Sequence, residues 1–437
     1  MEPEYDLQID ARWIIPVQPQ GLLDHHSLLV KDGKIAKILP TANTKPARAK
    51  EQITLSSHAL LPGFVNAHTH VAMSLLRGIA DDLPLMDWLQ NHIWPAENRW
   101  VSESFVEDGT NLAIAEMIRS GVTCFNDMYF YPEVTTRCAV NAGMRASIGL
   151  ILIDYPSSWA ANGDDYIDKG LALHDQYRNH PTITNLFAPH APYSVSDCYL
   201  QRIGILANEL DIGIHMHVQE TADEILQSIA THQCRPLERL NRLGLLGPSF
   251  LAVHMTQLTP KEIALVAEKN VQVIHCPKSN LKLASGFCPV GKLLAAKVNV
   301  AIGTDGSASN NNLDMLGELR TAALLAKAVQ QDASCLSAAR ALYMATLGGA
   351  RALGLDAITG SLKVGKAADC IAIDLDRVAT QPLYDPISQI VYAAHPDQIT
   401  DLWVEGKALL RKGVLTSLDE QRLLAKAKEW GQKIAGS

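Results

Sequence analysis

Two histidines, His68 and His70, stand one residue apart at the end of the apolar segment 60–67. Side chains two residues apart on a β-strand point to the same side, so we expect both imidazoles to face one way. Two imidazoles held side by side on a rigid element form half of a typical zinc site. The pair alone is a weak signal, because neighbouring histidines also occur on surfaces and in protein cores.

Polar side chains also follow other apolar segments in the middle of the chain. The candidate groups at five predicted strand ends are His68 with His70, His190, His215 with His217 and Glu220, His254, and Asp305. Histidine and carboxylate side chains serve both as N and O ligands of metal ions and as proton carriers in hydrolysis. Because such groups recur at strand ends, they indicate one shared site.

These residues also have purely structural interpretations. Asp305 suits the cap of a helix, and Glu220 suits the first turn of one. His215 and His275 fit hydrogen-bonded core positions. His215 shares a strand face with His217, so we expect it to line the barrel behind the site.

The middle of the chain alternates between apolar strands and amphipathic helices. We predict strands near residues 61–67, 122–127, 145–152, 183–189, 212–218, 250–254, 271–275 and 298–303. Of the helices, 104–120 begins with a Ser104/Glu107 capping box, and 196–210 carries apolar side chains at helical spacing. This rhythm predicts an α/β fold, a (β/α)8 TIM barrel. A doubly wound open sheet is the alternative, but only barrel closure brings the first and last strands together.

Both ends of the chain are rich in strands and tight turns, such as the hairpin signal Asp32-Gly33. We therefore predict one small β-sandwich domain formed from both termini. The predicted parts are the small β domain at 1–60 together with 360–417, the metal-dependent catalytic barrel at 61–359, and a C-terminal surface helix at 418–437. Residues 77–100 read as a loop, of the kind that closes over active sites.

Composition excludes several functional classes. The net charge of −8 and the lack of a Lys/Arg run argue against a nucleic-acid partner. The eight cysteines form no C-x-x-C pair, which is typical of reduced thiols. The acidic N-terminus lacks signal-peptide features and no apolar run is long enough to span a membrane, so we expect a cytoplasmic protein without a membrane partner. The oligomeric state stays open, with a homo-oligomer as one option.

The pattern of candidate residues resembles the amidohydrolase superfamily, specifically its mononuclear zinc deaminases. Longer segments are similar to the 5′-methylthioadenosine/S-adenosylhomocysteine deaminase family over nearly the whole chain: Ile93-Trp94-Pro95-Ala96-Glu97, residues 188–196 and residues 303–312. Binuclear relatives carry a lysine where this chain has His190, which favours one metal ion.

The resemblance implies a role for each candidate. His68, His70, His217 and Asp305 are expected to hold one Zn²⁺ per subunit, with Fe²⁺ left open by the ligand types. Glu220 is expected to carry a proton from water to ring N1, His254 to orient that water, and Asp305 to relay a proton to the leaving ammonia. Glu97 is expected to bind the ribose hydroxyls and His190 the purine, with Glu220 and Asp305 also contacting the substrate.

The function that follows is hydrolytic deamination of 5′-methylthioadenosine, a purine nucleoside, with S-adenosylhomocysteine and adenosine left open as further substrates. Some family members bind the homocysteine carboxylate with an arginine shortly after a Gly-Met-Arg-Ala segment. This chain has Arg145 inside that segment and none after it, and Arg145 also suits a structural role. The alternatives are an aminohydrolase of guanine, cytosine or s-triazines, and a catalytically silent scaffold. Glu97 distinguishes a nucleoside deaminase from an aminohydrolase of free bases, because a free base has no ribose for Glu97 to bind.

Overall fold

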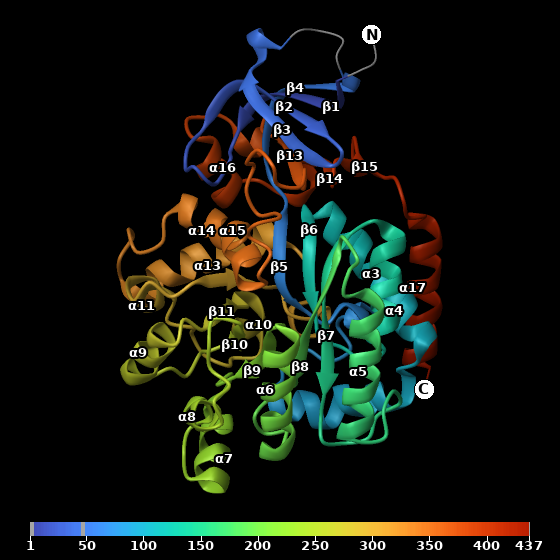
Figure 1. Ribbon diagram of the computed structural model, residues 1–437, viewed down its shortest axis with the longest axis vertical. Helices are drawn as coiled ribbons and strands as arrows, with labels where there is room; N and C mark the ends of the chain where they lie inside the picture. Colours follow the sequence, from blue (N-terminus) through green and yellow to red (C-terminus); the bar gives the residue numbers. More distant parts are fainter. Residues whose placement is uncertain (1–3, 45–48, 437) are drawn as a thin grey trace.

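The computed structural model describes residues 4–44 and 49–436 (Figure 1). Over this described part, the strands form one parallel sheet and one mixed sheet, each of eight strands. Residues 1–3 of the acidic N-terminal segment lie outside it. Also within this part, no helix combines the length and the apolar character needed to cross a membrane. All eight cysteines are free thiols.

The parallel sheet is the predicted barrel. Each strand pairs in parallel with the next one along the chain. Its members are β5 (Phe64–Thr69), β6 (Val122–Asp127), β7 (Arg145–Leu152), β8 (Ile183–Pro189), β9 (Ile214–Val218), β10 (Phe250–His254), β11 (Gln272–His275) and β12 (Val300–Ile302). Every residue of β6 and β7 is buried, because the strands are covered on one face by helices and on the other by the barrel interior.

Polar contacts, rather than a hydrogen-bonded strand pair, join the first and last strands. The Asn66 side chain accepts the backbone N–H of Thr304 at 2.9 Å and donates to its hydroxyl at 2.7 Å. The N–H of Asp305 donates to the carbonyl of His68 at 3.0 Å. Gly303 makes this approach feasible, because a Cβ atom there would lie 2.8 Å from the His68 nitrogen.

Helices surround the barrel strands (Figure 1). They are α3 (Glu103–Arg119), α4 (Pro132–Ala142), α5 (Gly163–Tyr177), α6 (Asp197–Leu210), α7 (Ala222–His232), α8 (Pro236–Arg242), α9 (Pro260–Glu268), α10 (Pro277–Lys282), α11 (Val290–Ala295), α12 (Ser307–Asn310), α13 (Met315–Gln330), α14 (Ala338–Met344) and α15 (Leu347–Ala352). The predicted Ser104/Glu107 capping box is wrong. The N-cap of α3 is Ser102, whose hydroxyl accepts from Phe105 N, so the helix starts earlier than expected.

The segment 77–100 is not a loop throughout, as the sequence predicted. After η2 (Val71–Leu76), residues 77–84 lack helix, but α1 (Leu85–Trp88), the π-helical η3 (Leu89–Ile93) and α2 (Trp94–Trp100) follow without a break. The loop signals on which that prediction rested, Gly78, Asp81, Asp82 and Pro84, all precede residue 85. Beyond it, the side chains of Leu85, Trp88 and Ile93 are buried, so tertiary packing holds the helical turns in place.

The mixed sheet confirms a small β domain built from both ends of the chain. Its order is β16-β15-β14-β13-β4-β1-β2-β3, with β1 (Tyr5–Ile14), β2 (Leu23–Lys31), β3 (Lys34–Pro40), β4 (Ala49–Pro62), β13 (Cys370–Asp374), β14 (Ile399–Val404), β15 (Lys407–Arg411) and β16 (Val414–Leu415). Strand β4 continues into β5 through Gly63 alone. A Cβ atom on Gly63 would lie 2.1 Å from the Thr123 side chain.

The remaining elements lie close to this sheet or on the barrel surface: η1 (Thr41–Asn43), η4 (Val378–Thr380), α16 (Pro386–Tyr392), η5 (Pro396–Gln398) and α17 (Glu420–Ala435). Helix α17 is mostly exposed, in keeping with the predicted surface helix, and it runs beside α3 (Figure 1). Trp430 is its one buried residue; the indole packs on Phe105 and donates to Asp108 at 2.9 Å.

Candidate metal centre and active site

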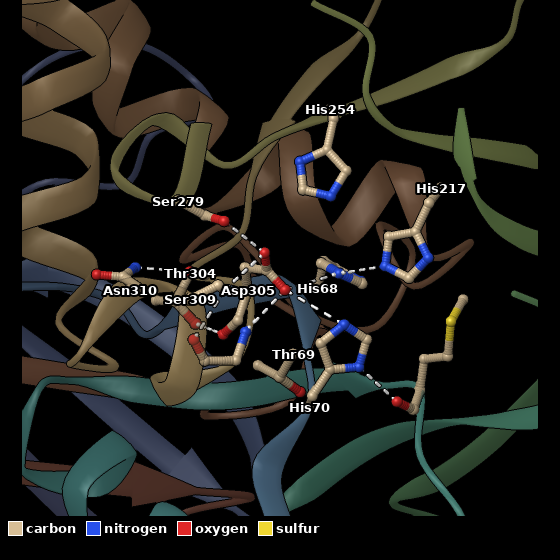
Figure 2. Close-up of polar contacts among 12 residues, drawn as sticks. His68, Thr69, His70, His217, His254, Ser279, Thr304, Asp305, Ser309 and Asn310 are labelled. Atoms are coloured by element: carbon tan, nitrogen blue, oxygen red, sulfur yellow. Dashed lines mark hydrogen bonds and ion pairs between the residues drawn. The ribbon is translucent and has the colours of Figure 1, made fainter. Parts of the chain in front are cut away.

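Four side chains from three barrel strands converge at the carboxyl ends of the strands (Figure 2). Asp305 follows β12, and its Oδ1 lies 3.3 Å from Nε2 of His68 and 3.2 Å from Nε2 of His70. His217, on β9, brings its Nε2 within 3.1 Å of the His68 Nε2. Potential ligand atoms of His68, His217 and His254 also lie within 4.8 Å of one another, as do those of His68, His70 and Asp305.

The other ring nitrogen of each histidine has a partner outside this cluster. Nδ1 of His70 donates to the carbonyl of Met128 at 2.6 Å, and Nδ1 of His217 donates to the carbonyl of His190 at 2.8 Å. Nδ1 of His68 lies 2.9 Å from Nε2 of His215. With a proton held on Nδ1, each Nε2 presents a lone pair to the common centre, as metal ligation requires.

Protonation states also fit a cation. Burial lowers the pKa of His68 to about 4 and that of His217 well below its usual range, so both imidazoles are neutral. Burial raises the pKa of Asp305, but hydrogen bonds and charge from His68 and His70 outweigh it and hold that pKa well below its usual range. Burial lowers the pKa of His70 as well, but the hydrogen bond and charge of Asp305 outweigh it and raise that pKa to about 9. A divalent ion such as Zn²⁺ would take the place of this proton, because a histidine ligand must be deprotonated, and the resulting set of three imidazoles and one carboxylate fits such an ion.

Asp305 is held by contacts to both of its oxygens. Ser279 and Ser309 donate to Oδ2 at 2.6 and 2.9 Å, and the N–H of Gly306 donates to Oδ1 at 2.8 Å (Figure 2). The backbone of Asp305 has a φ of 62°, a left-handed conformation that is uncommon for a residue with a Cβ. The two serines therefore fix the direction in which the carboxylate faces the histidines.

Glu220 and His254 form a second pair beside the cluster. Oε2 of Glu220 lies 3.7 Å from Nε2 of His254. Nδ1 of His254 donates to the side-chain oxygen of Asn280 at 2.8 Å, which leaves Nε2 directed at the carboxylate. Burial raises the pKa of Glu220, while the charge of His254 opposes the shift. A carboxyl group with a raised pKa is suited to take up and release a proton near neutral pH.

The candidate residues share one cavity of about 560 Å³. Seven of the sequence-predicted site residues line it: His70, Glu97, His190, His217, Glu220, His254 and Asp305. The eighth, His68, is fully buried and is not part of the lining. Residues of α1, η3 and α2, including Trp88 and Trp94, line it as well. The predicted loop segment therefore forms part of the cavity wall.

Two further candidates, which are not among the clustered ligand atoms, line the same cavity. Glu97, on α2, accepts a hydrogen bond from the Tyr129 hydroxyl at 2.8 Å, and burial raises its pKa to about 7. His190 follows β8; its Nδ1 lies 2.9 Å from the Ser194 hydroxyl. Burial lowers the pKa of His190 to about 3, so its ring is neutral.

Arg145, whose role the sequence left open, and His275, which was expected at a hydrogen-bonded core position, both lie outside the cavity lining. Arg145 is buried at the start of β7, where its Nε donates to Asp369 at 2.9 Å and its guanidinium contacts Glu405 at 3.3 Å. This is a structural position at the opposite end of the strand from the site. His275 is buried at the end of β11, and its Nδ1 has no hydrogen-bond partner among the described residues.

Three side chains that hold the candidates in place were not conspicuous in the sequence, namely Tyr129, Ser279 and Asn280. Ser279 and Asn280 follow the apolar strand that ends at His275, so a strand-end signal was present. Tyr129 follows β6 in the same way. Ser279 and Asn280 have no titratable group, and burial raises the pKa of the Tyr129 phenol well above its usual range, so none of the three stood out as a proton carrier.

Residues 59–409 match the model of the amidohydrolase family. The chain is 50% identical over 431 residues to a 5-methylthioadenosine/S-adenosylhomocysteine deaminase of Saccharophagus degradans, covering 98% of this chain and 97% of the relative. A protein of the same description from Aquifex aeolicus is 40% identical, with 99% and 98% covered. The crystal structure of an adenosine deaminase from Xanthomonas campestris with bound zinc superposes with a TM-score of 0.98 at 50% identity, covering 100% of both chains.

Proposed function

The chain belongs to the amidohydrolase family, and we propose that it is a zinc-dependent deaminase of 5′-methylthioadenosine. The reaction replaces the 6-amino group of the purine with oxygen from water and releases ammonia. The observation that carries the proposal is a single cavity that joins the His and Asp cluster to Glu97, a carboxylate suited to a ribose diol. The similarity to the S. degradans and X. campestris deaminases supports the same reaction class.

The proposed metal ligands are His68, His70, His217 and Asp305. A bound Zn²⁺ supplies a water molecule whose pKa is lowered to about 7. Glu220 takes a proton from the attacking water and delivers it to N1 of the purine, which makes C6 more electrophilic. His254, 3.7 Å from Glu220, orients the attacking oxygen. Asp305 takes the remaining proton of the attacking oxygen and passes it to the amino group, which departs as ammonia and leaves the 6-oxo group.

The cavity lining supports a substrate with an apolar 5′ substituent. Met86, Trp94, Phe130 and Tyr155 contribute apolar surface, and none of the described residues that line the cavity is Lys or Arg. The methylthio group suits such walls. The homocysteine tail of S-adenosylhomocysteine carries a carboxylate, which would lose hydration there without gaining a cationic partner.

The test is an ultraviolet assay of zinc-loaded protein with 5′-methylthioadenosine, S-adenosylhomocysteine, adenosine and guanine in parallel. We expect conversion of the adenine spectrum to a hypoxanthine spectrum with release of ammonia, and the highest kcat/KM for 5′-methylthioadenosine. Equal kcat/KM for the first two substrates would remove the argument about the tail. No turnover of any of the four, with zinc bound, would overturn the proposal in favour of another aminohydrolase or a silent scaffold.

Replacement of Glu97 tests the nucleoside assignment. Loss of hydrogen bonds to a charged group costs about 1.5–3 kcal/mol, so Glu97→Ala should lower kcat/KM for 5′-methylthioadenosine by about 10- to 150-fold. Unchanged kcat/KM in this variant would show that no ribose is bound there.

A further inference from the structure

Two helices of the barrel begin with the same sequence pattern but use it differently. Thr259 and Glu262 at the start of α9 form a full capping box: the Thr259 N–H donates to the Glu262 carboxylate at 2.8 Å, and the Thr259 hydroxyl accepts the Glu262 N–H at 3.3 Å. Thr221 and Glu224 occupy the same positions at the start of α7. There the threonine still accepts the Glu224 N–H at 3.3 Å, but the glutamate does not return to the cap.

The carboxylate of Glu224 instead reaches the turn that carries Glu220. Its Oε1 accepts the backbone N–H of Gln219 at 2.9 Å, and its Oε2 accepts the backbone N–H of Glu220 at 2.7 Å. Glu224 is 6% exposed and Gln219 is fully buried. Gln219 has a φ of 52°, in the left-handed region, and this conformation turns two successive N–H groups toward one anion.

Contacts from the residues that directly follow β10 complete the support of this turn. The Thr256 hydroxyl donates to the carbonyl of Glu220 at 2.6 Å, and the N–H of Met255 donates to the carbonyl of Val218 at 3.2 Å. Met255 and the adjacent His254 also have positive φ values of 50° and 73°. Glu220 and His254 therefore stand on two unusual turns that are tied to each other, and Glu224 supplies the acceptors for both N–H groups of the first.

We propose that Glu224 is a positioning residue for the proton carrier Glu220. Without the carboxylate, two buried N–H groups lose their acceptors. The left-handed conformation of Gln219 is then no longer stabilised by these hydrogen bonds, and we expect the turn to shift toward an ordinary conformation. The Glu220 side chain would then lose its alignment with His254 and the substrate. Glu224 does not line the cavity itself, so it acts through the backbone. This inference rests on the proposed function, because the role of Glu220 does.

The first experiment compares Glu224→Gln with the matched control Glu262→Gln. Both replace a buried glutamate at the third position of a barrel helix, but only Glu224 contacts the turn. In Glu224→Gln we expect a kcat for 5′-methylthioadenosine at least tenfold lower, with KM within threefold and one zinc per chain retained. Glu262→Gln should keep kcat within threefold. A wild-type kcat in Glu224→Gln would overturn the proposal.

A double-mutant cycle with Glu220 separates positioning from general damage to the fold. If Glu224 acts through Glu220, the substitution Glu224→Gln should lower kcat much less in a Glu220→Gln background than in the wild type. A purely structural loss would reduce kcat by the same factor in both backgrounds, and that result would refute the proposal. Glu224→Asp, which is too short to reach both N–H groups, serves if Glu224→Gln does not fold.

We call the two hydrogen bonds from the N–H groups of Gln219 and Glu220 to Glu224 the Glu224 clamp. Hydrogen exchange tests this clamp independently of the reaction. In zinc-loaded protein, the peptide that contains Gln219 and Glu220 should exchange at least tenfold faster in Glu224→Gln than in Glu262→Gln. If the wild type is inactive but the two variants still differ in exchange, the proposed function is refuted and the clamp is supported. Active protein with equal exchange in the two variants would refute the clamp alone.

Discussion

The hydrogen bond between Tyr129 and Glu97 joins the β6 end to helix α2 across the cavity. The phenol occupies Oε1 of Glu97, which leaves Oε2 to face a ligand. Burial raises the pKa of Glu97 to about 7, and the bond from Tyr129 and the charge of His70 limit the rise. The charge on this carboxylate therefore changes within the neutral range.

This pair predicts a pH dependence of nucleoside binding. A carboxyl group is ionised above its pKa, and the ionised form accepts two hydrogen bonds from a diol. The affinity for 5′-methylthioinosine, the product, should therefore increase between pH 6 and pH 8. Calorimetric titration at several pH values would measure it. Tyr129→Phe should move the increase to higher pH, because it removes a bond that lowers the pKa, and Glu97→Gln should abolish it. An increase that persists in Glu97→Gln would assign it to another group.

The sequence predicted the principal polar groups of the site because strand geometry determines where they point. His68 and His70 are separated by one residue, and His190, His217, His254 and Asp305 each follow an apolar run, so convergence at one barrel end was expected. Tyr129 and Glu224 could not be assigned in this way. Tyr129 donates to Glu97, which lies 32 residues earlier in the chain on α2, and the sequence predicts a loop there. Glu224 has a capping-box sequence that gives no sign that its carboxylate contacts a neighbouring turn.

Among the elements, β7 connects the barrel to the small sheet. Arg145 begins the strand and pairs with Asp369, which directly precedes β13, and with Glu405, in the turn between β14 and β15. The side chains of Arg145 and Asp369 are 2% and 0% exposed. The strand extends about 20 Å from Arg145 to its carboxyl end, so this cation stabilises the contact between the sheets and does not reach the cavity.

Replacement of Arg145 should therefore change stability without changing specificity. Removal of one partner of a buried ion pair costs about 3–5 kcal/mol, so Arg145→Met should lower the free energy of unfolding by that amount in urea titrations. The ratio of kcat/KM for 5′-methylthioadenosine to that for S-adenosylhomocysteine should stay constant. Arg178→Met, which breaks an exposed pair with Asp175, should have an effect below about 1 kcal/mol. A higher ratio in Arg145→Met would indicate that Arg145 contacts the homocysteine tail, because only turnover of S-adenosylhomocysteine would then fall.

Elements with strong hydrophobic patterns were predicted closely, and those that depend on tertiary contacts were not. Strands β6, β7, β8 and β10 have the predicted bounds, because each is a short, almost completely buried segment that contains several apolar residues. Helix α3 starts at an earlier cap than predicted, because two serines compete as N-cap and only packing selects Ser102. The helical turns α1 and η3 depend on burial of Leu85 and Ile93, which the local Gly and Pro signals concealed.

At the scale of the molecule, the proposed ligands come from the first, fifth and last barrel strands. The first and last strands have no hydrogen-bonded ladder between them, so a metal ion held by His68, His70, His217 and Asp305 adds a bond across that junction. Zinc at 100 times its dissociation constant would stabilise the fold by about 2.7 kcal/mol.

Removal of zinc by a chelator should accordingly lower the melting temperature, and added zinc should restore it. Differential scanning calorimetry with and without chelator would measure the shift. His217→Ala should remove the zinc-dependent shift, whereas Glu220→Gln, which leaves the proposed ligands intact, should keep it. Equal melting temperatures with and without bound zinc would contradict a role of the metal in joining the strands.

The small sheet can be completed only late in synthesis, because its strands come from both ends of the chain. Strand β4 pairs with β1 on one side and with β13 on the other, yet about 300 residues of chain separate Pro62 from Cys370. At 5–20 residues per second, a ribosome needs about 15–60 s to produce the partner of β4. During that interval the β1–β4 unit presents an open strand edge, the kind of surface that recruits chaperones or pairs with another nascent chain. Slow translation of the barrel would therefore make this protein more prone to aggregate, even though its finished form covers that edge.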